Sequence, residues 1–314
     1  GNVMAKIILI ALSAVVVLFV LPTMLISLII FNVLLVSQNK EKWSRECSWD
    51  DPEQEEMFAA GAWWGKENEE FLREVSIHND GFRLVGEYFD FGNKKAVIII
   101  PGRMETCIYS YYFAKPFKDS GYNVLAIDNR SHGLSEGKYN TLGLKEYRDI
   151  IAWAEFLKNQ CGIETVFLHG ICIGSATALY ALTSENCPEC IKGMSADGMY
   201  VNFIESYKNH LIERNKPLFP FLAEFRFLIK LVSGKDPVKF SPINLMPKLK
   251  KPILFIYTKK DTYSVPEKGQ LLFDTCTAPK KLVWFDKGIH SHVRINAVEK
   301  YDSTICEFLK EYIQ

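Results

Sequence analysis

The longest hydrophobic stretch in the chain covers residues 7–36, where almost every side chain is apolar. A helix needs ~20 apolar residues to cross a bilayer, so this stretch is long enough. It is apolar on every face, unlike a helix packed in a soluble core. It exceeds the apolar core of a signal peptide, and no small-residue cleavage pattern follows it. We therefore predict one transmembrane helix, within an N-terminal anchor of residues 1–40.

The charges that flank this stretch bear on its orientation. Lys6 precedes it, and Lys40, Lys42 and Arg45 follow it, although two glutamates dilute the second group. The positive-inside rule weakly favours a cytoplasmic location for the rest of the chain, and the number of potentially free thiols favours the same side. Neither observation decides the orientation, so we predict a membrane location without a side.

Residues 41–72 mix charged and aromatic side chains, which predicts a juxtamembrane linker that runs into a helix. Its tryptophans have two alternative environments, the lipid interface or the surface of the following domain. These tryptophans are Trp43, Trp49, Trp63 and Trp64.

Residues 73–314 alternate between strand and helix patterns. Strand-like segments flank Asn79-Asp80-Gly81, a sequence typical of a hairpin turn. Continuous apolar runs are typical of strands buried on both faces of a parallel sheet, and helical spacing lies between them, most clearly over residues 144–158. The alternation predicts one α/β domain with a mostly parallel, doubly wound sheet. The apolar runs are at residues 96–100, 123–128, 164–168, 253–257 and 281–285.

This alternation is interrupted over residues 198–248, a segment longer than an ordinary connection. It contains the aromatic, amphipathic sequence LFPFLAEFRFLIKLV. We interpret the segment as an inserted helical lid. A helix that only packs on the domain and a second contact with a membrane surface are the alternatives.

One motif provides most of the candidate chemistry. His169-Gly170-Ile171-Cys172-Ile173-Gly174-Ser175 follows a predicted strand and opens a predicted helix. Its G-x-C-x-G core has the spacing of a nucleophile elbow, with cysteine in place of serine. The turn is too tight for side chains at its two glycines, and the helix dipole favours a thiolate at the central residue. Cys172 is therefore the candidate nucleophile, and a buried structural cysteine is the alternative.

An acid and then a base should follow the nucleophile along the chain. Asp261 comes just after the run at residues 253–257, at the end of a strand where such a fold places its site. A surface turn is the alternative for this residue. After the last predicted strand, His290 and His292 compete as base; His290 is preferred because it is nearer to the strand end, and His292 is the fallback.

An oxyanion hole requires two backbone N–H groups aimed at a developing negative oxygen. Ile173, just after the nucleophile, is the first candidate donor. The second is Arg103, in the loop Pro101-Gly102-Arg103-Met104. The Arg103 side chain has two alternative partners, an anionic substrate or solvent.

These residues resemble the α/β-hydrolase superfamily, in particular a bacterial branch of membrane-anchored proteins similar to lysophospholipases and dipeptidyl peptidases. The resemblance runs from about residue 74 to the C-terminus and includes DSGYNVLAIDNRSHGLSEG and HGICIG. Tyr301 follows His290 about where similar proteins have a tyrosine in the last helix, which supports the choice of His290. Pro101 and Asn129-Arg130-Ser131 depart from the family pattern. Cys172 replaces the usual serine, as in dienelactone-hydrolase-like members.

The resemblance implies an α/β-hydrolase fold and a hydrolase with a Cys172–His290–Asp261 triad. Such a triad cleaves an ester or thioester through an acyl-enzyme, and the apolar lid favours a small hydrophobic acyl substrate. Two alternatives remain open. One is an acyltransferase that uses the same acyl-enzyme, and the other is a non-catalytic, membrane-tethered binding protein.

Composition excludes some other classes. A hydrophobic content of 48% excludes a disordered chain. The 37 basic and 37 acidic residues form no basic stripe, so no nucleic-acid partner is expected. Cys187-Pro188-Glu189-Cys190 lacks a second ligand pair for zinc and is interpreted as loop thiols or an incidental disulfide. No cofactor or metal is predicted, and the sequence does not determine the oligomeric state.

Overall fold

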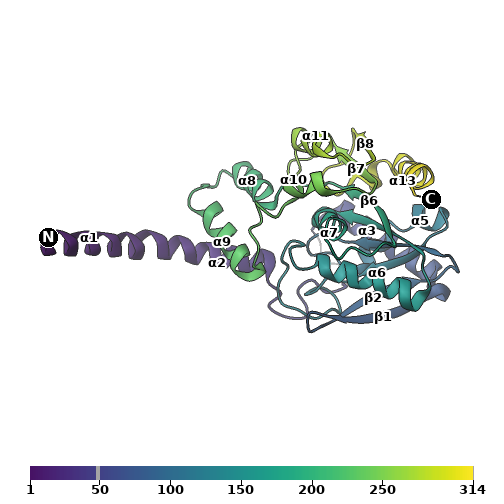
Figure 1. Cartoon of the computed structure of the whole chain (residues 1–314), viewed down its shortest axis with the longest axis horizontal. Helices are drawn as coiled ribbons and strands as arrows, with labels where there is room; N and C mark the ends of the chain where they lie inside the picture. Colours follow the sequence, from purple (N-terminus) through teal and green to yellow (C-terminus); the bar gives the residue numbers. More distant parts are fainter. Residues whose placement is uncertain (47–49, 314) are drawn as a thin grey trace.

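The structure, a computed structural model, describes residues 1–46 and 50–313, so Cys47 and Trp49 lie outside the described residues. A long N-terminal helix projects from an α/β domain (Figure 1). Two helices of the lid lie beside the C-terminal half of this N-terminal helix (Figure 1). The domain contains an eight-stranded sheet in the order β1-β2-β4-β3-β5-β6-β7-β8. β2 is antiparallel to both β1 and β4, and the other pairs are parallel. This confirms the predicted mostly parallel, doubly wound α/β sheet.

Each predicted apolar run forms a strand, and β1 and β2 form the predicted hairpin. Its turn uses Asp80 and Gly81, with φ of 50° and 80°. One strand, β6, has no counterpart among the predicted runs, because its sequence IKGMSAD interrupts the apolar residues with polar ones. The strands are β1 (Leu72–Asn79), β2 (Phe82–Phe89), β3 (Lys95–Ile100), β4 (Asn123–Ile127), β5 (Thr165–Ile171), β6 (Ile191–Asp197), β7 (Ile253–Thr258) and β8 (Lys280–Phe285).

Helices cover both faces of the sheet. On one face, α6 (Tyr147–Cys161), α7 (Ile173–Leu182) and α11 (Pro266–Thr275) bury Trp153, Leu179 and Leu272 in one apolar cluster. On the other, the apolar cluster includes Phe117 and Phe308. The helices of that second face are α3 (Pro52–Glu67), α4 (Cys107–Tyr111), α5 (Lys115–Asp119) and α13 (Val298–Tyr312). Short helical turns occupy Glu69–Phe71, Met246–Lys248 and α12 (Val293–Asn296).

The lid segment forms α8 (Phe203–Glu213), α9 (Phe221–Ser233) and the short α10 (Pro242–Leu245). These helices share a third apolar cluster with α2 and with the outer side of α7. The rings of Tyr207 on α8 and Phe225 on α9 are in contact, with centroids 4.4 Å apart and planes tilted by 31°. The lid is therefore packed between the N-terminal helix and the start of α7.

The N-terminal helix consists of α1 (Asn2–Val15), a π-helical turn (Val16–Val20) and α2 (Leu21–Leu35). It is long and apolar enough to cross a membrane. No side chain of α1 or of the π-helical turn is buried, whereas α2 buries a stripe that includes Ser27 and Phe31. Glu224 of α9 accepts hydrogen bonds from Thr23 and Ser27, at 3.1 and 3.3 Å. The first part of the helix thus buries no side chain, and its ring contact with the domain is Phe19 on Phe219, with centroids 6.4 Å apart.

The linker after this helix is attached to the domain. Trp43 is buried and stacks on His132, with ring centroids 4.4 Å apart, so it packs on the domain instead of facing lipid. Arg45 forms ion pairs with Asp128 and Glu87, at 2.8 and 2.5 Å. Trp63, in contrast, is 62% exposed.

Candidate active site

A sharp elbow joins β5 to α7 at Cys172. Its backbone has φ of 54° and ψ of −115°, a strained conformation that costs about 1–3 kcal/mol and that the surroundings must hold in place. The Cys172 N–H donates to the carbonyl oxygen of Asp197 at 2.8 Å. A Cβ on Gly174 would lie 2.1 Å from the Ile100 oxygen, and one on Gly170 would lie 2.4 Å from the Gly174 oxygen. Both glycines are therefore required by packing, and the turn directs the Cys172 side chain away from the sheet.

His290 and Asp261 meet at the carboxyl ends of the neighbouring strands β7 and β8. His290 Nδ1 lies 2.6 Å from Asp261 Oδ2. The other carboxylate oxygen, Oδ1, accepts the backbone N–H groups of Tyr263 and Ser264, each at 2.8 Å. Asp261 is buried, and these bonds fix its carboxylate against the imidazole. The structure thus brings the predicted acid and the preferred base into direct contact.

Cys172 lines the same cavity as His290 and is the second side chain that acts on the imidazole. Burial lowers the pKa of His290, because it disfavours the imidazolium. The charges of Cys172 and Asp261, with hydrogen bonds to both, outweigh burial and raise this pKa well above its ordinary value of 6.5. The arrangement therefore favours a protonated imidazole at His290, between Asp261 and Cys172.

His292, the fallback base, has a different partner. Its Nδ1 lies 2.7 Å from Glu53 Oε2 on α3. Asn296 also approaches Glu53, at 3.3 Å, so this histidine belongs to a contact between α3 and α12. His290 therefore contacts Asp261, whereas His292 contacts α3.

The loop after β3 presents one N–H group to the cavity. The Gly102 N–H donates to Glu105 Oε2 at 2.9 Å, and the Met104 N–H donates to His132 Nε2 at 3.3 Å. Between them, the Arg103 N–H has no hydrogen-bond partner within the described part of the chain. The Ile173 N–H, the first of α7, cannot bond within its helix. These two are the N–H groups predicted for an oxyanion hole.

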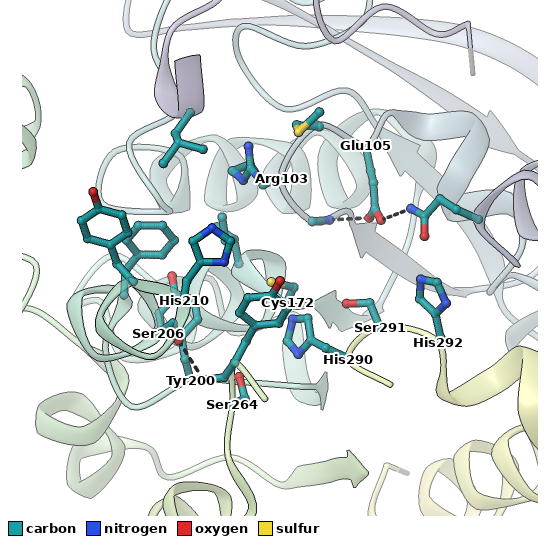
Figure 2. A pocket seen from close by; sticks show the side chains of 18 of the residues that line it. Arg103, Glu105, Cys172, Tyr200, Ser206, His210, Ser264, His290, Ser291 and His292 are labelled. Carbon is teal, nitrogen blue, oxygen red and sulfur yellow. Dashed lines mark hydrogen bonds between the residues drawn. The ribbon is translucent and has the colours of Figure 1, made fainter. Parts of the chain in front are cut away.

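Glu105 is a buried residue that sequence reasoning missed. Besides Gly102, it accepts a hydrogen bond from the Gln54 side chain at 3.1 Å (Figure 2). Burial raises its pKa, and the hydrogen bonds from Gly102 and Gln54 oppose that shift. Its contacts hold the candidate oxyanion loop against α3.

A cavity of about 310 Å³ opens above Cys172. Arg103, Cys172, Tyr200, His210 and His290 surround the same space (Figure 2). Helix α8 of the lid also contributes apolar rings, and Leu34, in the last turn of α2, lines the same cavity. The N-terminal helix therefore reaches the wall of the site. Within residues 1–46 and 50–313, no group of three or more His, Cys, Asp or Glu side chains is arranged to hold a metal ion.

Comparison with known proteins identifies the family. Residues 92–199 match the family described as serine aminopeptidase S33. The chain is 31% identical over 216 residues to the uncharacterized protein YqkD of Bacillus subtilis, covering 68% of this chain and 70% of that protein. The chain belongs to the α/β-hydrolase superfamily. This confirms the fold and the superfamily that the sequence motifs predicted, whereas the membrane-anchored branch stays a prediction.

Solved structures agree with this assignment. The esterase Pf2001 of Pyrococcus furiosus superposes on this α/β-hydrolase with a TM-score of 0.67 and 25% identity, over 80% of this chain and 94% of the esterase. The acylaminoacyl peptidase of Pyrococcus horikoshii has the same fold, with a TM-score of 0.59 and 17% identity. That match covers 77% of this chain and 41% of the peptidase.

A buried polar network lies beneath the elbow of the hydrolase. Asp197 ends β6 beside Ile171, and its Oδ2 accepts the Tyr301 hydroxyl at 2.7 Å. Tyr301 lies 3.2 Å from His169 Nε2, and His169 Nδ1 lies 2.6 Å from the Ser195 hydroxyl. Tyr301, whose position supported the choice of His290, therefore contacts Asp197 and His169. Burial raises the pKa of Asp197 to about 6 and lowers that of His169 to about 3.

The other cysteines that the structure describes lie outside the cavity. Every cysteine that the structure describes is a free thiol, including Cys187 and Cys190. The C-x-x-C segment is thus a pair of loop thiols, and the alternative of an incidental disulfide is wrong for this structure.

Proposed function

We propose that this α/β-hydrolase cleaves an ester or thioester of a hydrophobic acyl substrate. In this proposal Cys172 is the nucleophile, His290 the general base and Asp261 the residue that orients it. The observation that supports it most is the strained elbow, which places Cys172 beside an imidazole held by Asp261 at 2.6 Å. The esterase Pf2001 and the apolar wall of the cavity support an acyl ester as the substrate.

The reaction follows from this geometry. The Cys172 thiolate attacks the carbonyl carbon, and the negative oxygen that develops accepts the Ile173 and Arg103 N–H groups. The C–O or C–S bond then breaks, and His290 gives its proton to the leaving alcohol or thiol. His290 next takes a proton from water, which attacks the thioester and releases the acid and free Cys172. Asp261 keeps Nδ1 of His290 protonated throughout.

We also propose that the N-terminal helix anchors the enzyme in a membrane. Nineteen residues of α1 and the π-helical turn, Asn2–Val20, have no buried side chain. At 1.5 Å per residue they extend about 28 Å, close to the ~30 Å hydrocarbon core. The lid and the cavity then lie next to the membrane surface, where acyl substrates concentrate.

Alkylation and hydrolysis assays test the proposed reaction on the full chain. We expect iodoacetamide to alkylate Cys172 at neutral pH faster than the other thiols, with protection by acyl esters. Cys172→Ala should abolish ester hydrolysis, whereas Cys187→Ala, which removes a partly exposed loop thiol, should not change it. Alcohol, thiol and amine acceptors in the same assay distinguish acyl transfer from hydrolysis. Full ester hydrolysis by Cys172→Ala would exclude the proposed nucleophile.

A further inference from the structure

Arg103 differs from the other buried and half-buried arginines of the domain in having no carboxylate partner. Its side chain is half-buried in the wall of the cavity beside Cys172 (Figure 2). Among the residues that the structure describes, no carboxylate lies within 4.0 Å of its guanidinium. Each other arginine that is buried or half-buried has such a carboxylate. These are Arg45, Arg130, Arg148, Arg226 and Arg294.

This unpaired cation has an energetic cost. Burial lowers the pKa of Arg103, because the cavity wall removes water from the guanidinium; the charges of Cys172, Tyr263 and Glu105 oppose this shift but do not cancel it. A charge that is partly desolvated and unpaired is unfavourable until an anion reaches it. The planar guanidinium presents two parallel N–H groups, a geometry that fits a carboxylate or a phosphate.

The acidic groups near the cavity do not serve as that anion. Glu105 is committed to Gly102 and Gln54 on the side of the cavity toward α3. Asp51 accepts the Gln54 N–H as the cap of α3 and lies 3.9 Å from His292. On the lid side, burial and Arg214 lower the pKa of His210, Glu213 opposes them, and Arg103 adds to the lowering. Among the described residues, the lid side of the cavity therefore supplies no carboxylate partner for Arg103.

We infer that Arg103 forms a subsite for an anionic group of the substrate, a carboxylate or a phosphate. The backbone of Arg103 lies at the candidate oxyanion hole, so its side chain begins next to the reacting carbonyl. Phe203, Tyr207 and Leu34 provide the apolar surface of the same cavity. The substrate class is therefore an acyl ester or thioester that combines an apolar chain with a negative charge. The claim that this substrate is cleaved rests on the proposed function, whereas the claim that Arg103 binds an anion does not.

Calorimetry with compounds that cannot be cleaved tests the subsite separately from catalysis. The probes are three ethers of the same size: 4-butoxybenzoate, 4-butoxyphenyl phosphate and the neutral 4-butoxybenzamide. They are titrated into the full chain in a neutral detergent. We expect at least one anion to bind about tenfold or more tightly than the amide, as a charge-assisted hydrogen bond permits. The stronger of the two anions identifies carboxylate or phosphate.

Two Arg103 variants and one control complete the test. Arg103→Gln should remove the preference for the anion and leave the affinity for the amide within about twofold. Arg103→Lys should keep part of the preference, because it retains the charge without the planar fork. Arg148→Gln, which changes a paired arginine on α6 outside the cavity, should behave as wild type. Equal binding of all three ethers by wild type, or an anion preference that survives in Arg103→Gln, would overturn the subsite.

Discussion

His290 and His292 are two residues apart, yet their contacts give them different roles. His290 is held by Asp261 in the cavity that Cys172 lines, whereas His292 is held by Glu53. We expect His290→Gln to lower kcat/KM for an acyl ester by about 10²–10⁴, the range for loss of a general base. His292→Gln should change it less than about tenfold, since only packing against α3 is altered. Similar losses in both variants would show that the two roles are not separate.

Asp197 provides a prediction on pH. Burial raises its pKa from an ordinary 3.8 to about 6 in the folded chain. Between these values the folded state binds more protons than the unfolded state, so the free energy of unfolding falls as pH rises. The expected fall is about 3 kcal/mol, at 1.36 kcal/mol for each pH unit.

Asp197→Asn imitates the neutral acid and still accepts the Tyr301 hydroxyl. All other titratable groups are the same in the two proteins, so the difference between their free energies of unfolding at each pH reports on Asp197. Urea unfolding from pH 4 to pH 7 should show a wild-type curve that falls relative to that of Asp197→Asn. Parallel curves would mean that folding does not raise the pKa of the Asp197 carboxyl.

The residues of the candidate triad were accessible from sequence because each follows a strand end. Parallel strands share one carboxyl edge, so topology alone brings Cys172, Asp261 and His290 together. Glu105 and the partner of His292 were not accessible in this way. Glu53 and His292 are 239 residues apart, and nothing in either local pattern indicates their contact. Asp197 was not predicted as a site residue because β6, the strand that it ends, was not predicted.

Strand β6 and the elbow show why some elements are predictable and others are not. The elbow requires glycines at fixed spacing, which a sequence displays directly. The sequence of β6 does not indicate a buried strand, because Lys192, Gly193 and Ser195 interrupt its apolar residues. Its place is determined by neighbours: a Cβ on Gly193 would lie 2.9 Å from the Pro252 oxygen. The tertiary fit of β7 against β6 therefore selects glycine where a strand pattern predicts an apolar side chain.

The elbow itself gives a prediction at the level of one element. In Gly174→Ala the new Cβ would lie 2.1 Å from the Ile100 oxygen, so β3 and α7 must separate. We expect a loss of about 4 kcal/mol or more in the free energy of unfolding, together with loss of Cys172 alkylation. Gly92→Ala is the control, because its φ of 80° is also unfavourable to alanine but its Cβ meets open space. It should cost only about 1–2 kcal/mol and leave the thiol reactive.

On the scale of the whole molecule, the N-terminal helix has two proposed functions, which a pair of truncations separates. Its first part, Asn2–Val20, buries nothing, whereas α2 packs on the lid and lines the cavity with Leu34. Removal of residues 1–20 should therefore leave the free energy of unfolding nearly unchanged. It should convert the protein from an integral form, resistant to alkaline carbonate, to one that carbonate extracts from vesicles.

Removal of residues 1–36 should have a different result. It exposes the lid surface that Phe31, Leu35 and Val36 cover, and each of these side chains is at most 6% exposed. At about 1.5–3 kcal/mol for each buried side chain, the loss of stability is on the order of 5 kcal/mol. Glu224 also loses the hydrogen bonds that it accepts from Thr23 and Ser27. If both truncated proteins unfold at the same denaturant concentration, α2 is only a tether, and the lid holds its position over Cys172 without the membrane helix.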